Sequence, residues 1–312
     1  MPDRFLIDGI VAVVPTPFTS EEAVDWAAIG GLIDFACACG ACAVCLPAYG
    51  SEFYKLSEAE RLRLVSEAVE VARGRIPVVA QVNHPSALRA VEAARACEDV
   101  GAAAISTAVP RLFPLGEADL MRYFSRLLEA IGLPLLVQDF NPGGPTVRAE
   151  FVGELHRRYP HFRYVKLEEP RMAAKVARIR EETSDGVGVL TGWGGMYLLE
   201  LAETGIAGAM PGLALTDLLD RVFRLARTGR KAEAAEIFEG VLPQIVFSLQ
   251  NLELYHHAEK SLLRARGVLV ETHVREARLE LDPGERAHLE FLNSRILALL
   301  ERLGLPRNPA AA

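Results

Sequence analysis

Several signals that mark whole classes of protein are missing from this chain of 312 residues. The net charge is −7 and no cluster of lysine and arginine offsets it, so we expect no nucleic-acid partner. No apolar run approaches the ~20 residues that cross a bilayer. Residues 1–14 lack the basic start and long apolar stretch of a signal peptide. We therefore expect a cytoplasmic protein with no membrane partner.

Cysteine is scarce, and four of the five cysteines fall within residues 37–45. Their spacing differs from the paired C-x2-C pattern of zinc sites. Cys37 and Cys39 lie in an alanine-rich helical stretch and Cys45 in a β run, so we interpret them as small core residues in a reducing compartment. No set of His, Asp and Glu has convincing metal-ligand spacing either. The sequence predicts neither a metal site nor a cofactor.

What the chain does have is a strict alternation of short apolar runs with helical patterns. Half of its residues are hydrophobic and 24% are charged, which is enough for a large core. The apolar runs do not alternate with polar residues, as is typical of strands covered on both faces in a parallel sheet. Eight strand candidates precede residue 216: residues 10–14, 43–46, 78–81, 103–107, 135–138, a run around Lys166, 187–190 and 206–210.

Eight strand–helix units within residues 1–215 predict an α/β fold, a (β/α)8 TIM barrel. A doubly wound open sheet is the alternative. It usually has fewer strands, and no G-x-G-x-x-G follows the first strand, so a dinucleotide-binding sheet is disfavoured. Residues 216–305 contain only helical patterns and predict a C-terminal helical extension. We expect residues 306–312 to form a flexible tail.

The sixth strand candidate carries an unusual pair of charged residues. Strand alternation places Tyr164, Lys166 and Glu168 on one face, which in a closed barrel points inward near the C-terminal mouth. Active sites of TIM barrels lie at that mouth. A buried lysine is costly unless it is paired or used, and its obvious use is a Schiff base with a carbonyl substrate. The alternative is a structural ion pair between Lys166 and Glu168.

Several segments together resemble the N-acetylneuraminate lyase / dihydrodipicolinate synthase superfamily of Schiff-base barrel enzymes. They are residues 15–18 (P-T-P-F), 50–52 (G-S-E), 165–166 (V-K) and 205–208 (G-I-A-G), and the helical extension is also typical. The resemblance spans nearly the whole chain. It implies that Lys166 forms the imine and that the substrate is a 2-oxo acid, such as pyruvate or a 2-keto-3-deoxy sugar acid. It also implies a homo-oligomer, a dimer or a tetramer.

The chain departs from the family pattern at three loops. The family's Y-N-x-P after the fifth strand is replaced by Q-D-F-N-P, so Gln138 takes the tyrosine position. The G-T-T-G-E loop reads A-Y-G-S-E at residues 48–52, and Arg111 follows Pro110 where a tyrosine pair is common. Two interpretations follow. Either other residues have replaced the missing catalytic groups, and the protein is an aldolase or dehydratase, or catalysis is lost and the protein only binds 2-oxo or sugar acids. A metal-dependent or phosphate-binding barrel enzyme is a third hypothesis.

Candidates for residues that replace the missing catalytic groups lie at the strand ends. Glu168 is a candidate general acid or base, and Tyr49 can supply a phenol unless it only packs at a subunit interface. The amide of Gln138 can hydrogen-bond a substrate hydroxyl or carbonyl. The backbone N–H groups of Gly50 and Ser51, with the Ser51 hydroxyl, can cradle a carboxylate.

Four further residues complete the expected substrate-binding set. Arg111 can bind a second anionic group, or be a solvated loop residue. His84 follows the third strand and either touches substrate or hydrogen-bonds within its loop. Trp193 walls the pocket or caps the barrel. Thr16 lies in the turn after the first strand.

Overall fold

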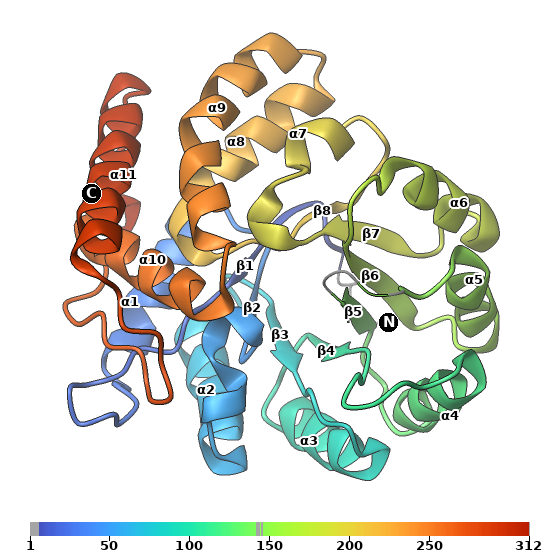
Figure 1. Ribbon diagram of the computed structural model, residues 1–312. Helices are drawn as coiled ribbons and strands as arrows, with labels where there is room; N and C mark the ends of the chain where they lie inside the picture. Colours follow the sequence, from blue (N-terminus) through green and yellow to red (C-terminus); the bar gives the residue numbers. More distant parts are fainter. Residues whose placement is uncertain (1–5, 142–143, 145, 312) are drawn as a thin grey trace.

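The computed structural model describes residues 6–141, 144 and 146–311. Eight parallel strands form a closed barrel in sequence order, with β1 paired to both β2 and β8 (Figure 1). The TIM barrel is therefore confirmed, and the open sheet is excluded. The strands are β1 Gly9–Val13, β2 Ala43–Leu46, β3 Val78–Gln81, β4 Ala104–Ala108, β5 Leu135–Phe140, β6 Phe162–Glu168, β7 Gly188–Thr191 and β8 Gly208–Ala209.

A ring of helices surrounds the barrel (Figure 1). Its members are α1 Ala28–Ala38, α2 Glu58–Ala72, α3 Ala87–Asp99, α4 Glu117–Leu128, α5 Ala149–Arg158, α6 Ala173–Thr183, α7 Leu198–Leu201 and α8 Thr216–Arg227. A side-chain cap marks the start of one of them. At α2, the Ser57 hydroxyl accepts from Glu60 N and the Glu60 carboxylate accepts from Ser57 N, which is the capping box that the sequence indicates.

The core has two layers, because successive strand residues face opposite sides. One layer fills the space between strands and helices, where Ile10, Val44 and Val165 are almost fully buried. The other fills the barrel and includes Val79 and Tyr164. Lys166 and Glu168 continue the inward row of Tyr164 toward the C-terminal mouth. This alternation is why an apolar strand ends with two charged side chains facing the barrel axis.

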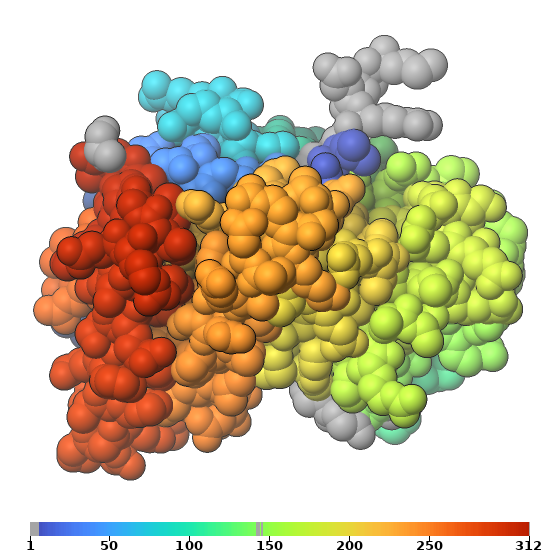
Figure 2. Space-filling model, turned by 90° about the horizontal axis from the view of Figure 1, so that it is seen from above, coloured from blue at the N-terminus to red at the C-terminus, as the bar shows by residue number. Residues whose placement is uncertain are grey.

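The extension comprises α9 Lys231–Ser248, α10 Leu252–Ala265 and α11 Pro283–Arg302. Figure 2 shows the red α11 and the orange α9 side by side on one flank of the barrel. The preceding α8 contacts β1 and α7 as well as α9. The described part of the C-terminal tail contacts α1, and Arg266 Nε donates to Arg307 O at 2.7 Å; residue 312 lies outside the described residues. The boundary at 215/216 stays a prediction.

All five cysteines are free thiols, and Cys39, Cys45 and Cys97 are buried. Burial raises the pKa of the Cys45 thiol to about 12, so this thiol inside the barrel is neutral. Among the described residues, no helix is long and apolar enough to cross a membrane.

Candidate active site

A cavity of about 490 Å³ opens at the C-terminal mouth of the barrel. Its walls come from the ends of β1, β2, β5, β6, β7 and β8 and from the start of the extension. Six of the residues expected from the sequence line it: Tyr49, Gly50, Gln138, Lys166, Glu168 and Trp193. The remaining walls are largely apolar and include Val13, Phe140, Met196, Met210, Pro211, Leu249, Leu252 and Tyr255.

Lys166 and Glu168 meet inside this cavity. Lys166 Nζ lies 3.2 Å from Glu168 Oε1, and the two side chains are only 7% and 5% exposed. The same carboxylate accepts from Gln138 Nε2 at 2.8 Å and from the backbone N–H of Trp193 at 3.2 Å. The carboxylate is therefore held by one cation and two neutral donors at the cavity wall.

Glycine at position 192 makes room for this carboxylate. A Cβ placed there would lie 2.2 Å from Glu168 Oε1, closer than any real contact. The backbone of Gly192 has φ −98°, a value open to any residue, so the requirement for glycine is steric. The loop after β7 thus packs its backbone directly on Glu168.

A row of polar side chains behind Gln138 fixes its orientation. Gln81 Nε2 donates to Gln138 Oε1 at 2.7 Å and to Asn83 Oδ1 at 3.1 Å, and Asn83 Oδ1 also accepts from Ala108 N at 2.7 Å. Since its oxygen is engaged by Gln81, Gln138 presents its NH₂ group to Glu168. The sequence analysis did not assign Gln81 or Asn83 a role, although polar residues at alternate positions of a strand end are the signal that marks them.

Tyr49 reaches the cavity from the loop after β2. Its ring packs between Phe53 and Phe140, with centroid distances of 5.0 and 4.9 Å. Burial, with the nearby Glu168 carboxylate, raises the pKa of the Tyr49 phenol. Tyr49 is therefore a neutral hydroxyl donor at the barrel mouth.

The two hydroxyl residues expected near it have other partners. Ser51 Oγ donates to Val14 O at 2.5 Å and accepts from Ala48 N at 2.9 Å, while Thr16 Oγ1 donates to Ser51 O at 2.6 Å. Neither residue lines the cavity, but Gly50 does. Ser51 and Thr16 thus join the turns after β1 and β2, and only the Gly50 part of the expected carboxylate cradle faces the cavity.

Arg111 and His84 lie outside the cavity. Arg111 Nη2 pairs with the buried carboxylate of Asp139, which also accepts from Val147 N at 2.7 Å. His84 lines a separate space of about 210 Å³ beside α2 and α3, and its Nδ1 accepts from Ser86 N at 2.9 Å. The structure therefore brings Tyr49, Gly50, Gln138, Trp193, Lys166 and Glu168 together, and places Thr16, Ser51, Arg111 and His84 around them.

A model of the dihydrodipicolinate synthetase family matches residues 6–294. The chain belongs to this family. An L-2-keto-3-deoxyarabonate dehydratase of Azospirillum brasilense is 28% identical, over 94% of this chain and 96% of the relative. A 4-hydroxy-tetrahydrodipicolinate synthase of Chlorobium limicola is 29% identical, over 74% and 79% of the two chains. The crystal structure of dihydrodipicolinate synthase from Rhodopseudomonas palustris has a TM-score of 0.87 and 26% identity, covering 94% of this chain and 98% of its own.

Membership of the dihydrodipicolinate synthetase family confirms the resemblance and the reaction class predicted from the sequence. The chain is a lyase of the Schiff-base type, an aldolase or a dehydratase, acting on a 2-oxo acid. Within this family, the present chain combines an inward lysine with a carboxylate two residues later and with glutamine at the end of β5.

One wall of this family member's cavity was missed by the sequence analysis. Tyr255, on the first full turn of α10, lines the cavity together with residues 249–252 that precede and begin that helix. Nothing in the local pattern signals this, because Tyr255 sits in an amphipathic helix some ninety residues after Lys166. Only the packing of the extension against the barrel mouth brings it there.

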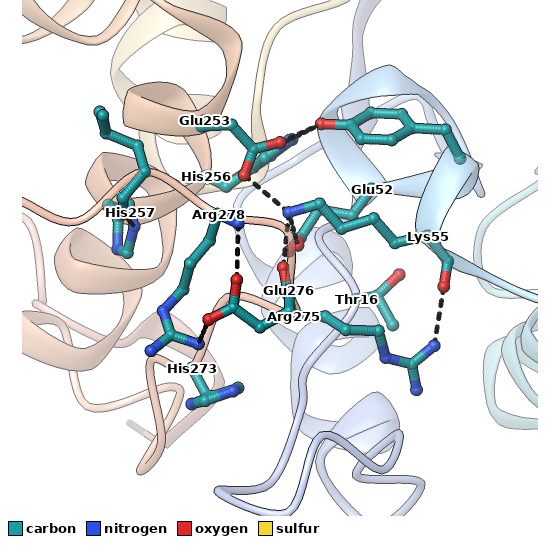
Figure 3. A network of polar contacts seen from close by, with 12 residues as sticks. Thr16, Glu52, Lys55, Glu253, His256, His257, His273, Arg275, Glu276 and Arg278 are labelled. Atoms are coloured by element: carbon teal, nitrogen blue, oxygen red, sulfur yellow. Dashed lines mark hydrogen bonds and ion pairs between the residues drawn. The ribbon is translucent and has the colours of Figure 1, made fainter.

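A buried charge network fastens α10 to the loop after β2 (Figure 3). Glu52 is fully buried and accepts from Lys260 Nζ at 2.5 Å and from Lys55 Nζ at 3.1 Å. Lys55 Nζ also pairs with Glu253 at 2.6 Å. Burial lowers the pKa of Lys260 to about 8, with Glu52 opposing the shift. The network sets where the loop carrying Tyr49 and Gly50 stands relative to the helix carrying Tyr255.

Proposed function

We propose that this enzyme dehydrates a 2-keto-3-deoxy sugar acid through an imine on Lys166. The observation that carries the proposal is the contact of 3.2 Å between Lys166 Nζ and Glu168 Oε1 inside a cavity large enough for a sugar acid. A buried amine with an adjacent carboxylate is the arrangement that imine chemistry followed by proton transfer requires. The dehydratase of A. brasilense, similar over nearly the whole length of the chain, supports the same choice.

The proposed reaction begins when Lys166 attacks the C2 ketone and water leaves, which forms a cationic iminium. Glu168 then takes a proton from C3, and the electron pair of the C3–H bond forms an enamine. The enamine then expels the C4 hydroxyl: a C3–C4 double bond forms, the C4–O bond breaks, and the hydroxyl leaves as water with the proton that Glu168 returns. Hydrolysis of the imine releases the dehydrated 2-oxo acid and frees Lys166. Each step uses groups that lie within the cavity.

The fifth strand favours dehydration over aldol cleavage. Aldol cleavage needs a base at the C4 hydroxyl, and the family's tyrosine on the fifth strand is replaced here by Gln138, which cannot accept a proton. Gln138 instead donates to Glu168 at 2.8 Å. The only ionisable pair that the described cavity walls present near the reacting carbons is Lys166 with Glu168, beside the phenols of Tyr49 and Tyr255.

Reduction with borohydride in the presence of pyruvate, followed by peptide mass spectrometry, tests the imine. We expect an adduct on Lys166 and none in Lys166→Met. Lys231→Met, which removes an exposed lysine paired with Glu203, should still give the adduct. Failure to trap pyruvate and longer 2-oxo acids would favour a non-catalytic binding protein.

Incubation with 2-keto-3-deoxy acids of five and six carbons distinguishes the two reactions. A dehydratase forms a product lighter by one water and releases no pyruvate, whereas an aldolase releases pyruvate and an aldehyde. Release of pyruvate as the main product would overturn dehydration and leave the imine intact.

We also propose that the protein is a homo-oligomer, a dimer or a tetramer. Leu112 and Phe113, in the loop after β4, are 76% and 60% exposed. Adjacent large apolar side chains at this exposure favour burial against a second copy. Light scattering coupled to size exclusion should give two or four times the chain mass, and a monomer at micromolar concentration would contradict the proposal.

A further inference from the structure

The hydroxyl of Tyr255 lies in the cavity wall, close to two glycines. A Cβ at Gly50 would lie 3.1 Å from this hydroxyl, and a Cβ at Gly212 would lie 2.5 Å from it. Glycine in both turns therefore leaves space that the phenol occupies. Among the described residues, the Tyr255 hydroxyl has no hydrogen-bond partner, although the side chain lines the cavity. A hydroxyl at the cavity wall without a hydrogen-bond partner is available to a ligand.

Topology places this hydroxyl beside the ends of β2 and β8, away from the strand that carries the reacting lysine. Gly50 follows β2 and Gly212 follows β8, while Gln138, Lys166 and Glu168 belong to β5 and β6. In a closed barrel of eight strands in sequence order, β1 lies opposite β5 and β2 lies opposite β6. A 2-oxo acid whose ketone carbon is bonded to Lys166 has room to direct another group toward Gly50 and Tyr255.

Within the loop after β2, the donors of Ser51 are not free to bind that group. The Ser51 hydroxyl is engaged with Val14 O and Ala48 N, and Ser51 N donates to Ala48 O at 3.0 Å. The expected cradle for the carboxylate therefore lacks its hydroxyl at the cavity surface. Tyr255 presents a hydroxyl beside the same glycine.

We propose that Tyr255 binds the carboxylate of the 2-oxo acid, donating its phenolic proton beside the backbone of Gly50. This assignment rests on the proposed function, because it takes the imine on Lys166 as the other anchor of the substrate. Tyr255 is then a substrate-binding residue that belongs to the C-terminal extension. The extension completes the active site of its own barrel.

The charges around Tyr255 are compatible with an anion there. Burial, with the carboxylates of Glu259 and Glu168, raises the pKa of the Tyr255 phenol, so it remains a proton donor. Glu259 lies one turn further along α10, and burial raises its pKa to about 7 while its Oε1 accepts from Ala214 N at 2.6 Å. A carboxyl that is largely neutral below this pH does not repel a bound carboxylate.

Tyr255→Phe tests the assignment, since it keeps the ring and removes the donor. We would measure the pyruvate concentration that half-saturates borohydride trapping at Lys166, and the same quantity for hydroxyacetone, a ketone without a carboxylate. A hydrogen bond to a charged group is worth a factor of about ten to a hundred. We expect the half-saturating concentration of pyruvate to rise by about that factor, and that of hydroxyacetone to stay within about twofold.

Tyr54→Phe is the matched control. Its hydroxyl bonds Glu253 and His256 on the same helix but does not line the cavity. It should leave both half-saturating concentrations unchanged. An unchanged pyruvate value in Tyr255→Phe, or an equal rise for both ketones, overturns the carboxylate assignment while an adduct in the wild type upholds the proposed function.

If the wild type forms no adduct, the proposed function fails and thermal stabilisation by pyruvate decides the Tyr255 assignment separately. A pyruvate-induced rise in Tm that is lost in Tyr255→Phe and kept in Tyr54→Phe supports it. A rise of equal size in wild type and Tyr255→Phe, or no rise in the wild type, overturns it.

Discussion

Gln138 Nε2 donates to Glu168 Oε2 at 2.8 Å, which joins the side chains of the neighbouring strands β5 and β6 at the barrel mouth. The register pairs Gln138 with Lys166, so the amide lies beside the lysine and reaches the carboxylate two residues further on. Gln138 holds Glu168 in place with its NH₂ group while Gln81 engages its oxygen. In the position where the family commonly has a proton-relaying tyrosine, this enzyme has a residue that positions a carboxylate.

Glu168→Gln should separate imine formation from turnover. The substitution keeps the shape of the side chain and removes its ability to carry a proton. We expect turnover of a 2-keto-3-deoxy acid to fall by about 10²- to 10⁴-fold, the usual worth of a general base, while borohydride still traps pyruvate on Lys166. Steady-state rates and adduct yields on the same preparation provide the measurement.

Glu169→Gln is the control for this change, because the neighbouring carboxylate pairs with Lys175 at 2.7 Å and does not line the cavity. It should turn over at close to the wild-type rate. Wild-type turnover in Glu168→Gln would exclude Glu168 as the base and direct attention to Tyr49.

Gly192→Ala should damage the site without straining the backbone. The new Cβ would lie 2.2 Å from Glu168 Oε1, so the carboxylate must shift from its observed position beside Lys166. A displacement of about 1 Å at reacting groups can cost roughly 100-fold in rate, and we expect a loss of kcat of that order. Gly30→Ala in α1, where nothing lies within 4 Å of the new methyl group, should keep full activity and gain up to about 1 kcal/mol in stability. Equal activities of the two variants would show that Glu168 can shift freely.

The inward face of β6 could be predicted because a strand has a fixed period. Once Lys166 is assigned to a strand of a closed barrel, Glu168 must share its face, and the structure confirms both positions. The strand boundaries were predicted to within a few residues because each strand is a short apolar run between helical patterns. β8 is the exception: it is only Gly208–Ala209, although the apolar run is longer.

The rest of the site depends on contacts between distant segments. Sequence placed Ser51 and Arg111 at strand ends, but their partners Val14 and Asp139 decide where their polar atoms point. His84 instead bonds within its own loop, accepting from Ser86 N, which is one of the two alternatives that the sequence left open. The position of Tyr255 depends on how α10 packs on the barrel, which no local period encodes. The sequence analysis therefore could not predict side-chain hydrogen bonds and packing between residues that are far apart in the chain.

Breaking the network of Figure 3 at Glu52 should destabilise the fold strongly. Glu52→Gln leaves the buried ammonium of Lys260 without its partner at 2.5 Å, and an uncompensated buried charge costs about 3–5 kcal/mol. The double variant Glu52→Gln/Lys260→Met removes that charge and should be more stable than Glu52→Gln alone. Urea unfolding followed by circular dichroism measures both free energies of unfolding.

The exposed pair of Arg63 and Glu67 supplies the comparison. Glu67→Gln should change the free energy of unfolding by less than about 1 kcal/mol, because solvent screens a surface pair. A double variant no more stable than Glu52→Gln would mean that Lys260 finds compensation elsewhere, in Glu253 or the carbonyl of His273.

Glu259 should make stability fall as pH rises toward neutrality. Burial raises its pKa in the folded protein from 4.5 to about 7. The folded state therefore holds a proton that the unfolded state has released across this window, so the contribution is complete below pH 4.5 and is lost as pH rises through 7. The loss amounts to about 3 kcal/mol. Glu259→Gln, whose amide oxygen can still accept from Ala214 N, removes this dependence.

We therefore expect the Tm of Glu259→Gln to exceed that of the wild type at pH 8, with the difference shrinking as pH falls to 5. Thermal unfolding at half-unit intervals of pH provides the curves. Glu239→Gln, at an exposed position of α9, should give a curve parallel to the wild type, because that carboxylate is solvated in both states. If the Glu259→Gln curve also ran parallel to the wild type, the carboxyl of Glu259 would titrate alike in the folded and unfolded states, and burial would not be holding its proton.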